Sequence, residues 1–339
     1  MPQNISNLKA LQDSQSKTEW NQTLSKFENK NIFQSFEWGE LKKDEGWKIS
    51  RISIINPITQ RTILLAQVLS KKYFGITVAW CPGGPVIDVS SIDESNDAFK
   101  CFKSMIFDMK IMNLRCNPYK SIKDKNNDIF SNLIKATAFV TSPRTSILRI
   151  EDKDKFLTKI RRKHRYYYTQ SKKHNIKWST HTGQDASKTF HQVYEKMITN
   201  KNLKLSMINI ENFAEKLGVS LTPPRLFTFA GTADGEIVSA CVVSLLDKKA
   251  FYHYAASSIR GRKIFASYGM VINLISVLHE YGVETLDFGG LSKDGSNKGV
   301  DFFKEGFNGE EFNKVGEYDI TKSKLNSFIF NKILKYINK

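Results

Sequence analysis

One lysine lies in a segment rich in aromatic residues and glycine, Asp301-Phe302-Phe303-Lys304-Glu305-Gly306-Phe307. A short apolar strand, 285–288, precedes this segment and ends at two glycines. We expect a loop that presents Lys304 between aromatic rings. A cation held there, on a backbone that glycine makes adaptable, can stabilise the oxyanion of an acyl transfer. Phe, Gly and Lys are also common in surface turns, so the segment taken alone favours a hairpin with an exposed lysine.

Two tyrosines flank a histidine in a predicted strand, 249–255. Alternate side chains of a strand face the same side, so Tyr252 and Tyr254 are expected together and His253 opposite to them. The two phenols can hydrogen-bond to the sugar or peptide of an acceptor substrate. His253 is interpreted as a core histidine. Asp287 is a carboxylate that can accept hydrogen bonds from nearby backbone amides, and this structural role is at least as well supported as a catalytic one.

A basic patch lies between residues 151 and 177, where ten Lys and Arg residues stand against three acidic ones. Arg161, Arg162, Lys163 and Arg165 lie beside three consecutive tyrosines, 166–168. Cations that contact phosphates, next to rings that stack on bases, are typical of a nucleic-acid surface. A solvated helix face is the usual alternative for such a run. The residues alone leave both interpretations open.

Three further polar residues are candidates for binding an acceptor. Lys42 closes a predicted helix and can neutralise a diphosphate, although a lysine there also compensates the helix dipole. Arg115 and Asn117 lie at a predicted strand end, where binding groups of α/β sheets collect. The Asn-Pro pair at 117–118 is also an ordinary turn signal.

The elements that must position these residues follow the same order twice. The first run predicts helices within 18–46, strands at 47–55, 61–69 and 78–81, a helix at 95–109 and a strand at 113–118. The second run predicts a strand at 145–150, a basic helix at 156–173, a strand at 176–179, a helix at 186–198, strands at 226–230, 236–245 and 249–255, a helix at 266–281 and a strand at 284–288. We therefore predict two similar α/β domains with mixed α+β sheets.

Composition bounds the class of protein. The 339 residues are 40% hydrophobic and 25% charged, which excludes a disordered or collagen-like chain. The net charge of +17 favours polyanionic partners, although lysine is abundant along the whole chain. Four scattered cysteines in no zinc spacing predict reduced thiols and no metal cofactor. Without a long apolar run or a signal peptide, we expect a cytoplasmic protein with no transmembrane segment.

Several short motifs, taken in their order along the chain, resemble those of a known protein family. They are Gln34-Ser35-Phe36-Glu37-Trp38-Gly39, Gly84-Pro85-Val86-Ile87-Asp88, Leu114-Arg115-Cys116-Asn117-Pro118, Pro143-Arg144-Thr145, Tyr252-His253-Tyr254-Ala255-Ala256-Ser257, Leu286-Asp287-Phe288-Gly289-Gly290, Phe303-Lys304-Glu305-Gly306-Phe307 and Gly316-Glu317-Tyr318. Together they resemble the Fem family (FemABX-like) of aminoacyltransferases. That resemblance implies two tandem GNAT-like acyltransferase domains, with aminoacyl-tRNA as donor substrate, no cofactor, and a peptidoglycan precursor, nucleotide- or lipid-linked, as acceptor. Peripheral membrane contact follows if the acceptor is lipid-linked.

The resemblance also assigns domains and roles. The first domain, on the acceptor side, is expected at 1–142 plus 320–339, with the C-terminal helix 323–337 returning to it, and the second at 143–319. Lys304 would contact the tRNA end and the developing oxyanion, and Phe303 would stack on the 3′ terminus. Because a tRNA donor needs a positive surface in the second domain, the resemblance favours tRNA binding by Arg161, Arg162, Lys163 and Arg165. The region 190–224 is too short for a helical arm, which is typical of the compact type of member. An Arg and a Tyr that hold muropeptides in some members align with Ile208 and Asn212 here.

Two other functions fit the same residues. An acyl-CoA-dependent enzyme, with acetyl-CoA as donor, would acylate an amino sugar of a surface polysaccharide. Its pyrophosphate loop would be the segment 260–266, which matches the expected glycine pattern only in part. A non-catalytic RNA- or anion-binding protein is the second alternative.

Overall fold

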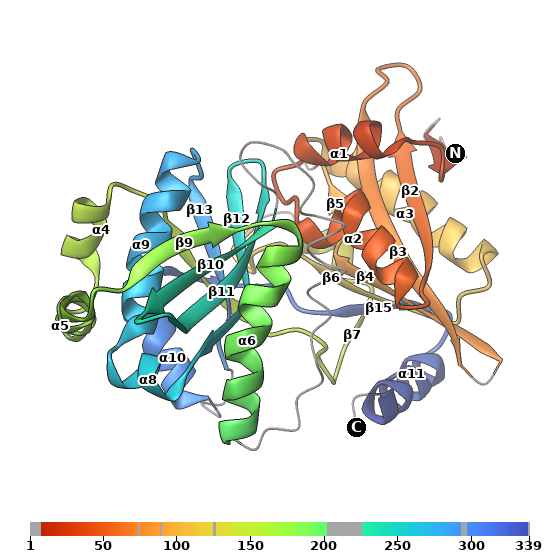
Figure 1. Cartoon of the computed structure of the whole chain (residues 1–339). Coiled ribbons are helices and arrows are strands. Elements are labelled where there is room, and N and C mark those ends of the chain that lie inside the picture. Colours follow the sequence, from red (N-terminus) through yellow and green to blue (C-terminus); the bar gives the residue numbers. More distant parts are fainter. Residues whose placement is uncertain are drawn as a thin grey trace, which may run out of the picture. The chain divides into compact units, whose positions relative to one another are not determined.

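The chain folds into two compact units, each built around one mixed sheet (Figure 1). The computed structural model describes residues 8–73, 75–88, 90–124, 127–201, 226–292 and 297–337. Unit 1 comprises Met1–Pro143 and Asn313–Lys339, and unit 2 comprises Arg144–Phe312. The chain thus re-enters unit 1 at Asn313, ahead of the expected residue 320. The alignment with Ile208 and Asn212 lies outside the described residues.

The sheet of unit 1 has the strand order β1-β2-β3-β4-β6-β15-β7, with β5 paired to β3. The strands are β1 (Lys9–Gln12), β2 (Lys48–Ile55), β3 (Thr62–Tyr73), β4 (Ile76–Gly83), β5 (Val86–Ile87), β6 (Asn113–Pro118), β7 (Ile134–Lys135) and β15 (Tyr318–Thr321). The helices are α1 (Lys17–Ser25), α2 (Phe36–Asp44), α3 (Ile92–Asp108) and α11 (Lys324–Ile337), with 3₁₀ turns η1 (Ile32–Gln34) and η2 (Asn127–Phe130).

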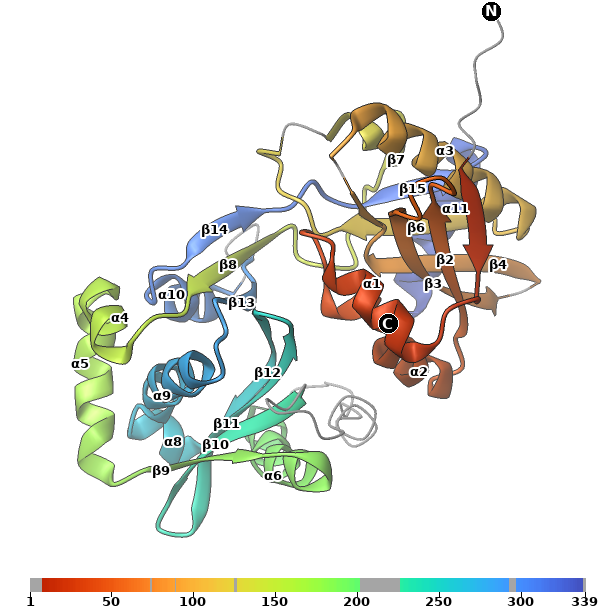
Figure 2. The same ribbon diagram turned by 90° about the horizontal axis from the view of Figure 1, so that it is seen from above.

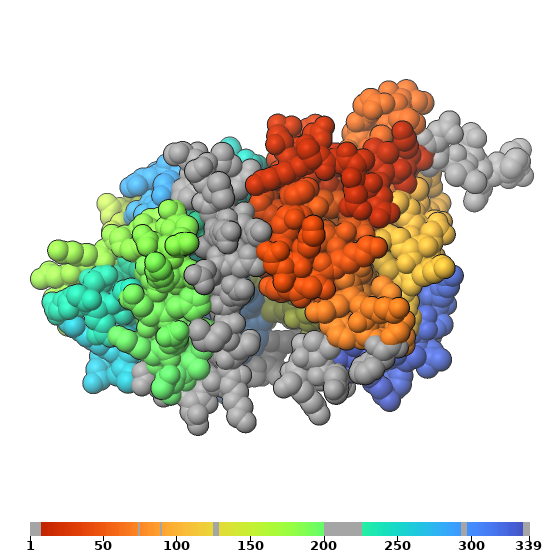
Figure 3. Space-filling model, turned by 45° about the vertical axis from the view of Figure 1, so that its right-hand side comes forward, coloured from red at the N-terminus to blue at the C-terminus, as the bar shows by residue number. Residues whose placement is uncertain are grey.

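Helices of unit 1 begin at side-chain caps that the sequence supplies. Ser16 caps α1, and its backbone N–H donates to the Glu19 carboxylate at 2.8 Å, which completes a capping box. The hydroxyls of Ser35 and Ser91 cap α2 and α3 by accepting from the backbone N–H groups of Trp38 and Glu94. Helix α3 packs its apolar stripe on β2 and β3, and α2 also contacts these two strands. Helix α1 contacts α2 and forms part of the outer surface seen in red in Figure 3.

The sheet of unit 2 has the order β14-β8-β13-β12-β11-β10-β9. The strands are β8 (Arg144–Arg149), β9 (Lys177–His181), β10 (Leu226–Ala233), β11 (Glu236–Leu246), β12 (Lys249–Ser257), β13 (Thr285–Gly290) and β14 (Glu310–Asn313). The helices are α4 (Lys153–Lys159), α5 (Arg162–Ser171), α6 (Gly183–Lys201), α8 (Ile259–Lys263), α9 (Ala266–Glu280) and α10 (Lys298–Glu305), with the 3₁₀ turn η3 (Lys172–His174).

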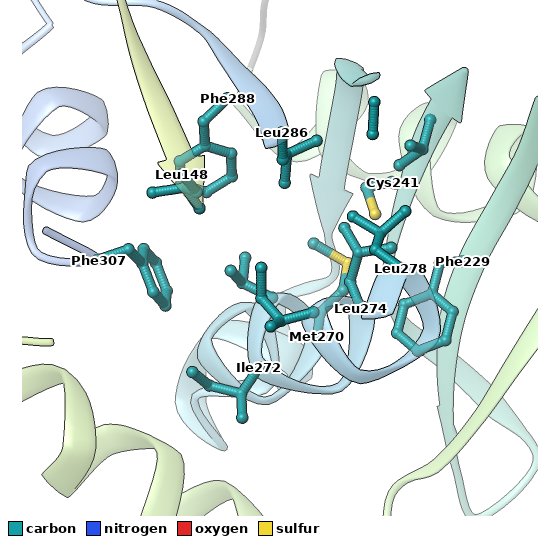
Figure 4. Packing of buried hydrophobic residues seen from close by; sticks show 14 of the residues in the cluster. Leu148, Phe229, Cys241, Met270, Ile272, Leu274, Leu278, Leu286, Phe288 and Phe307 are labelled. Carbon is teal, nitrogen blue, oxygen red and sulfur yellow. The ribbon is translucent and has the colours of Figure 1, made fainter. Parts of the chain in front are cut away.

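Helices cover both faces of this second sheet (Figure 2). Helix α9 lies on one face and carries α4 and α5 on its outer side, while α6 covers the other face. The main core lies on the α9 side, where α9 packs against apolar side chains of β8, β10, β11 and β13. Figure 4 shows this cluster, with Phe288 and Phe307 beside Leu148 at its edge.

The two units repeat one plan, as the sequence predicted. In each, an antiparallel meander is followed by a crossover helix and a strand parallel to the last meander strand: β4, α3 and β6 in unit 1, and β12, α9 and β13 in unit 2. Each parallel strand then pairs on its other side with an antiparallel strand, β15 or β8. The predicted mixed α/β class with two sheets is confirmed.

The basic helix predicted at 156–173 is wrong as a single element. It is divided into α4 and α5 by Ile160, whose backbone is extended (φ −77°, ψ 158°). The Ile160 side chain is buried in the core, and Arg161 remains extended before α5 begins. Burial of Ile160 therefore sets the corner between the two helices.

Candidate active site

The two parallel strands β12 and β13 separate at one end, and the candidate site lies there. Their pairing runs from Lys249 to Phe251 on β12, opposite Thr285 to Asp287 on β13. Beyond Asp287, the pairing of β13 with β8 also shifts before it resumes at Gly290. Gly289 between them has φ +81°, which few residues with a side chain adopt. This end of β13 therefore leaves its neighbour and exposes backbone groups.

Lys304 reaches this point from a helix, not from a loop as expected. The segment 298–305 forms the helix α10. Asp301 stabilises its first turn, where a negative charge is favourable. The Asp301 carboxylate also accepts hydrogen bonds from the Ser292 backbone N–H at 2.9 Å and from the Ser292 hydroxyl. On the last turn of α10, the Lys304 Nζ donates to the Gly290 carbonyl at 2.9 Å. The same ammonium lies 6.0 Å from the centroid of the Phe288 ring.

Gly289 makes room for the Lys304 ammonium. A Cβ atom at this position would lie 3.2 Å from Lys304 Nζ and 3.3 Å from the Tyr252 carbonyl oxygen. The ammonium, the two glycines and the Tyr252 carbonyl therefore meet within a few ångströms at the separation of β12 and β13. A cation held over a backbone gap in this way can face a carbonyl oxygen that develops negative charge.

Phe303 is half-buried in the aromatic cluster of unit 2. Its ring centroid lies 5.2 Å from those of Tyr268 and Phe307 and 6.0 Å from that of Phe288. The adjacent Phe302 is the more exposed ring, and the cations of Arg161 and Lys163 lie 5.9 and 5.4 Å from its centroid. Sequence reasoning missed Phe302, although its place beside Phe303 was a signal. Stacking of Phe303 on a nucleotide remains a prediction.

The expectation that Tyr252 and Tyr254 share a face is wrong. The pairing of β12 with β11 shifts between Val242 and Val243, so that a bulge at His253 breaks the alternation. Tyr252 packs on the α9 side, 4.9 Å from Phe288, whereas Tyr254 lies on the α6 side, 6.4 Å from Phe190. Of the two tyrosines, Tyr252 is thus the one that packs on Phe288, the ring that the Lys304 ammonium also approaches. Burial, with the Cys241 thiol beside it, keeps the pKa of Tyr252 above its usual range, so the phenol stays protonated.

His253 and Asp287 form polar contacts beside the site. The Ser244 hydroxyl lies 2.6 Å from His253 Nε2, and burial lowers the pKa of His253 to about 4. Asp287 accepts from the Gly289 backbone N–H at 2.9 Å and from the Thr145 hydroxyl. The predicted role of Asp287 as an acceptor of backbone hydrogen bonds is thus confirmed, and it fixes the turn that holds Gly289.

The basic residues of α5 divide into two groups. Arg161, Arg162 and Lys163 are exposed at its first turn. Arg165 instead donates through Nη1 to the carbonyls of Ile160 (2.5 Å) and Thr158 (3.2 Å), which caps the end of α4. Because these contacts use Nη1 of Arg165, we expect a structural role for this residue, and its contact with tRNA remains a prediction.

The predicted acceptor residues of unit 1 are held by other side chains. Lys42 bonds to Glu45 at 2.7 Å and lies 5.0 Å from the Trp38 ring centroid. Asn117 Oδ1 accepts from the Gly83 backbone N–H at 2.9 Å, and its Nδ2 donates to Thr141 Oγ1 at 3.2 Å. Contacts with an acceptor by Lys42 and Asn117 remain predictions.

Arg115 is a correction, because its side chain is completely buried. It donates to Asp319 through Nε (2.5 Å) and Nη2 (3.1 Å), and to Glu317 through Nη1 (3.2 Å). A guanidinium that is enclosed and paired with two carboxylates cannot reach a substrate. Arg115 instead ties β6 to β15 and so holds the returning C-terminal segment in unit 1.

Some other site types are not found in the part of the chain that the structure describes. No group of three or more His, Cys, Asp or Glu side chains there is placed to hold a metal ion. Across the same residues, no helix is long and apolar enough to cross a membrane.

Both the fold and the family of the chain follow from comparison with known proteins. The fold is that of tandem GNAT proteins: a structure titled "Tandem GNAT protein from the clavulanic acid biosynthesis pathway" matches with a TM-score of 0.57 at 8% identity, over 94% of this chain and 100% of that one. Residues 15–143 and 170–335 match the FemAB family, so the chain belongs to that family. It is therefore a FemABX-like transferase of peptidoglycan biosynthesis.

Two further solved structures share this fold. FemX matches with a TM-score of 0.80 at 17% identity, over 95% of this chain and 99% of that one. The C-terminal domain of a putative lysylphosphatidylglycerol synthetase from Agrobacterium fabrum matches with a TM-score of 0.56 at 11% identity, over 94% of this chain and 97% of that one. No curated protein sequence matches the chain.

Proposed function

We propose that this protein transfers an amino acid from aminoacyl-tRNA to an amine of a peptidoglycan precursor. The observation that carries the proposal is the Lys304 ammonium, 2.9 Å from the Gly290 carbonyl at the separation of β12 and β13. Membership of the FemAB family supports the acceptor class. The exposed cations at the start of α5, on the same unit, support a polyanionic donor.

The reaction needs little chemical assistance from the protein. The neutral amine of the acceptor attacks the ester carbonyl and forms the C–N bond, which gives a tetrahedral oxyanion. Collapse of that intermediate breaks the C–O bond to the ribose, and the leaving oxygen takes up the proton that the amine loses. A fixed ammonium lowers the energy of the oxyanion, and binding of the two substrates positions the amine against the ester. We assign stabilisation of the oxyanion to Lys304.

The alternative donor, acyl-CoA, is less well supported, because the segment 260–266 between β12 and α9 is poorly suited to bind its pyrophosphate. A pyrophosphate site there would need free backbone N–H groups at a helix start. In this chain the Gly261 N–H donates to the Ser258 hydroxyl at 3.0 Å, and the Phe265 N–H donates to the Arg262 carbonyl at 3.3 Å. These two donors are already used within the segment.

The donor can be tested directly by transfer of radiolabel to purified precursors. Charged tRNA carrying mixed labelled amino acids, and separately labelled acetyl-CoA, would be offered with a nucleotide-linked and with a lipid-linked precursor. We expect label from tRNA in one of the precursors. Transfer from acetyl-CoA alone would overturn the proposed donor.

Lys304→Ala should lower the rate of transfer by about 10²- to 10³-fold, the usual effect of removing one oxyanion donor. The matched control is Lys298→Ala, which removes an exposed lysine from the first turn of the same helix. We expect the control to keep nearly full activity, and both variants to keep tRNA affinity and melting temperature. Equal rates for the two variants would contradict the role of Lys304. Salt-sensitive binding of tRNA without any transfer by the native protein would favour the non-catalytic alternative.

A further inference from the structure

His164 on the basic helix α5 is completely buried against α10, the helix that carries Lys304. Its ring is surrounded by aromatic rings, with centroids at 5.0 Å for Tyr268 and Phe307 and 5.4 Å for Phe302. A histidine is an unusual choice for such an apolar position unless its polar atoms have a task.

The task of the ring is visible at the C-terminal end of α10. The last carbonyls of a helix lack partners within the helix and must find them elsewhere. His164 Nε2 lies 3.0 Å from the carbonyl oxygen of Phe303, and the Arg161 backbone N–H donates to the Gly306 carbonyl at 2.9 Å. The start of α5 thus caps the end of α10, next to Lys304.

Gly306 allows this close approach. A Cβ atom there would lie 1.9 Å from His164 Cε1 and 2.0 Å from Nε2, so any larger residue would displace the ring. Gly306 has φ −70°, which every residue adopts, and the glycine is therefore explained by the space that the imidazole occupies and not by backbone conformation.

The contact also fixes the charge and tautomer of His164. A carbonyl oxygen only accepts, so Nε2 must carry the proton and the neutral ring has its lone pair on Nδ1. Nδ1 is buried without a hydrogen-bond partner in the described structure, so its protonation would bury an unsatisfied N–H. Burial, opposed by the bond to Phe303 and assisted by Arg161 and Lys163, lowers the pKa of His164.

The charged and titratable groups around His164 come from three helices. Arg161 is the residue just before α5, Lys163 lies on α5, Tyr268 on α9, and Lys304 and Glu305 on α10. Arg161 pairs with Glu305 at 3.7 Å, so part of its charge is compensated there. The remaining cations disfavour a second positive charge on the ring.

We propose that His164 is a positioning residue for Lys304, which couples the donor-binding surface of α5 to the reacting end of α10. This inference rests on the proposed function, because it assigns α5 to the RNA donor and Lys304 to the oxyanion. By capping Phe303, the neutral imidazole sets the last turn of α10 against α5. Phosphates gripped by the exposed cations of α5 and the ammonium at Gly290 then keep one fixed spacing.

Two substitutions separate positioning from packing. His164→Gln places an amide N–H where Nε2 was and can still donate to the Phe303 carbonyl. His164→Asn places its amide where Nδ1 was and cannot reach it. Both lose the ring and should melt at a lower temperature than the native protein. We expect His164→Asn to lose about 10²-fold in kcat, the effect of a small misplacement, with an unchanged KM for charged tRNA, and His164→Gln to retain most of its kcat.

The pH profile provides a readout that packing alone would not move. The ratio of the native kcat to that of His164→Gln cancels the titration of the acceptor amine. We expect this ratio to fall as the pH is lowered through the pKa of His164, which lies below its ordinary value of 6.5, because only the native protein protonates residue 164. A pH-independent ratio, or equal kcat losses in the Gln and Asn variants, would overturn the proposal.

Failure of the inference can be told apart from failure of the proposed function. Long-range ¹H–¹⁵N NMR spectra of the native protein report the His164 tautomer without any substrate. The proposal expects protonated Nε2 and a neutral ring at pH 7. A protonated Nδ1 would overturn it even if transfer from tRNA is found, whereas absence of transfer with the expected tautomer would count against the donor alone.

Discussion

At the scale of single residues, the chemistry of a side chain was easier to predict than its accessibility. Lys304 could be singled out because an aromatic and glycine-rich context is visible in the sequence. Arg115 was misjudged, because its partners Asp319 and Glu317 are about two hundred residues away in sequence, and nothing local announces them. His164 was overlooked for a similar reason, since its value depends on a carbonyl of another helix.

Two glycines, Gly261 and Gly299, are expected to differ in how much stability a substitution by alanine costs. A Cβ at Gly261 would lie 1.9 Å from the Val238 carbonyl oxygen, which belongs to a strand and cannot move aside. Gly261→Ala should therefore lower the free energy of unfolding by about 1–3 kcal/mol.

The control is Gly299→Ala in α10, where a Cβ would meet nothing within 4 Å. Because alanine favours helix, this variant should be unchanged or more stable by up to about 1 kcal/mol. Urea unfolding of both variants measures the difference. A Gly261→Ala variant as stable as the control would contradict the close contact with β11.

At the scale of elements, apolar periodicity predicted most strands and helices, and tertiary contacts decided the exceptions. The division of α4 from α5 depends on burial of Ile160. The helical form of 298–305 depends on Asp301 binding Ser292, and the faces of Tyr252 and Tyr254 depend on a shift in the register of β12. Each exception involves a contact outside the segment itself, which its own apolar periodicity does not contain.

Helix α5 yields a prediction in which two neighbouring arginines behave differently. Arg162→Ala removes an exposed charge, so it should weaken binding of tRNA and reduce the slope of log K against log salt by about one, without changing the melting temperature. Arg165→Ala removes the cap of the Ile160 and Thr158 carbonyls, and should lower the melting temperature while leaving the salt slope unchanged.

Filter binding of labelled tRNA between 50 and 200 mM salt, together with thermal melts, would distinguish the two arginines. The reverse pattern, a reduced slope for Arg165→Ala and none for Arg162→Ala, would remove α5 from the donor surface.

At the scale of the whole molecule, the tandem fold and the family could be predicted from the motifs, because their order and spacing along the chain resemble those of the family. The candidate site was predictable in part. The sequence pointed to the end of β13, but the site residues of unit 1 proved to be mostly engaged within their own unit.

Acid stability is a property of the whole chain that two buried imidazoles should influence. Burial lowers the pKa of His253 from 6.5 to about 4, so the unfolded chain binds a proton at a higher pH than the folded one. The native protein should therefore lose stability as the pH falls from 6.5 toward 4, by up to about 3 kcal/mol from this residue.

His253→Gln cannot bind this proton, so its unfolding free energy should fall less over the same range. Urea titrations at pH 7 and pH 4.5 test the difference. The lowered pKa of His164 should leave a smaller acid dependence in the variant. Parallel pH profiles of the native and variant proteins would contradict a neutral His253 in the folded state.

The chain finishes unit 1 only after it has passed through unit 2, because β15 and α11 come from its last residues. On the ribosome, Arg115 is therefore synthesised long before Asp319 and Glu317, and its guanidinium stays solvated until these two carboxylates are available. The half that is synthesised first is thus the half that can be completed last, so nascent unit 1 should need chaperone protection for most of the time that translation takes.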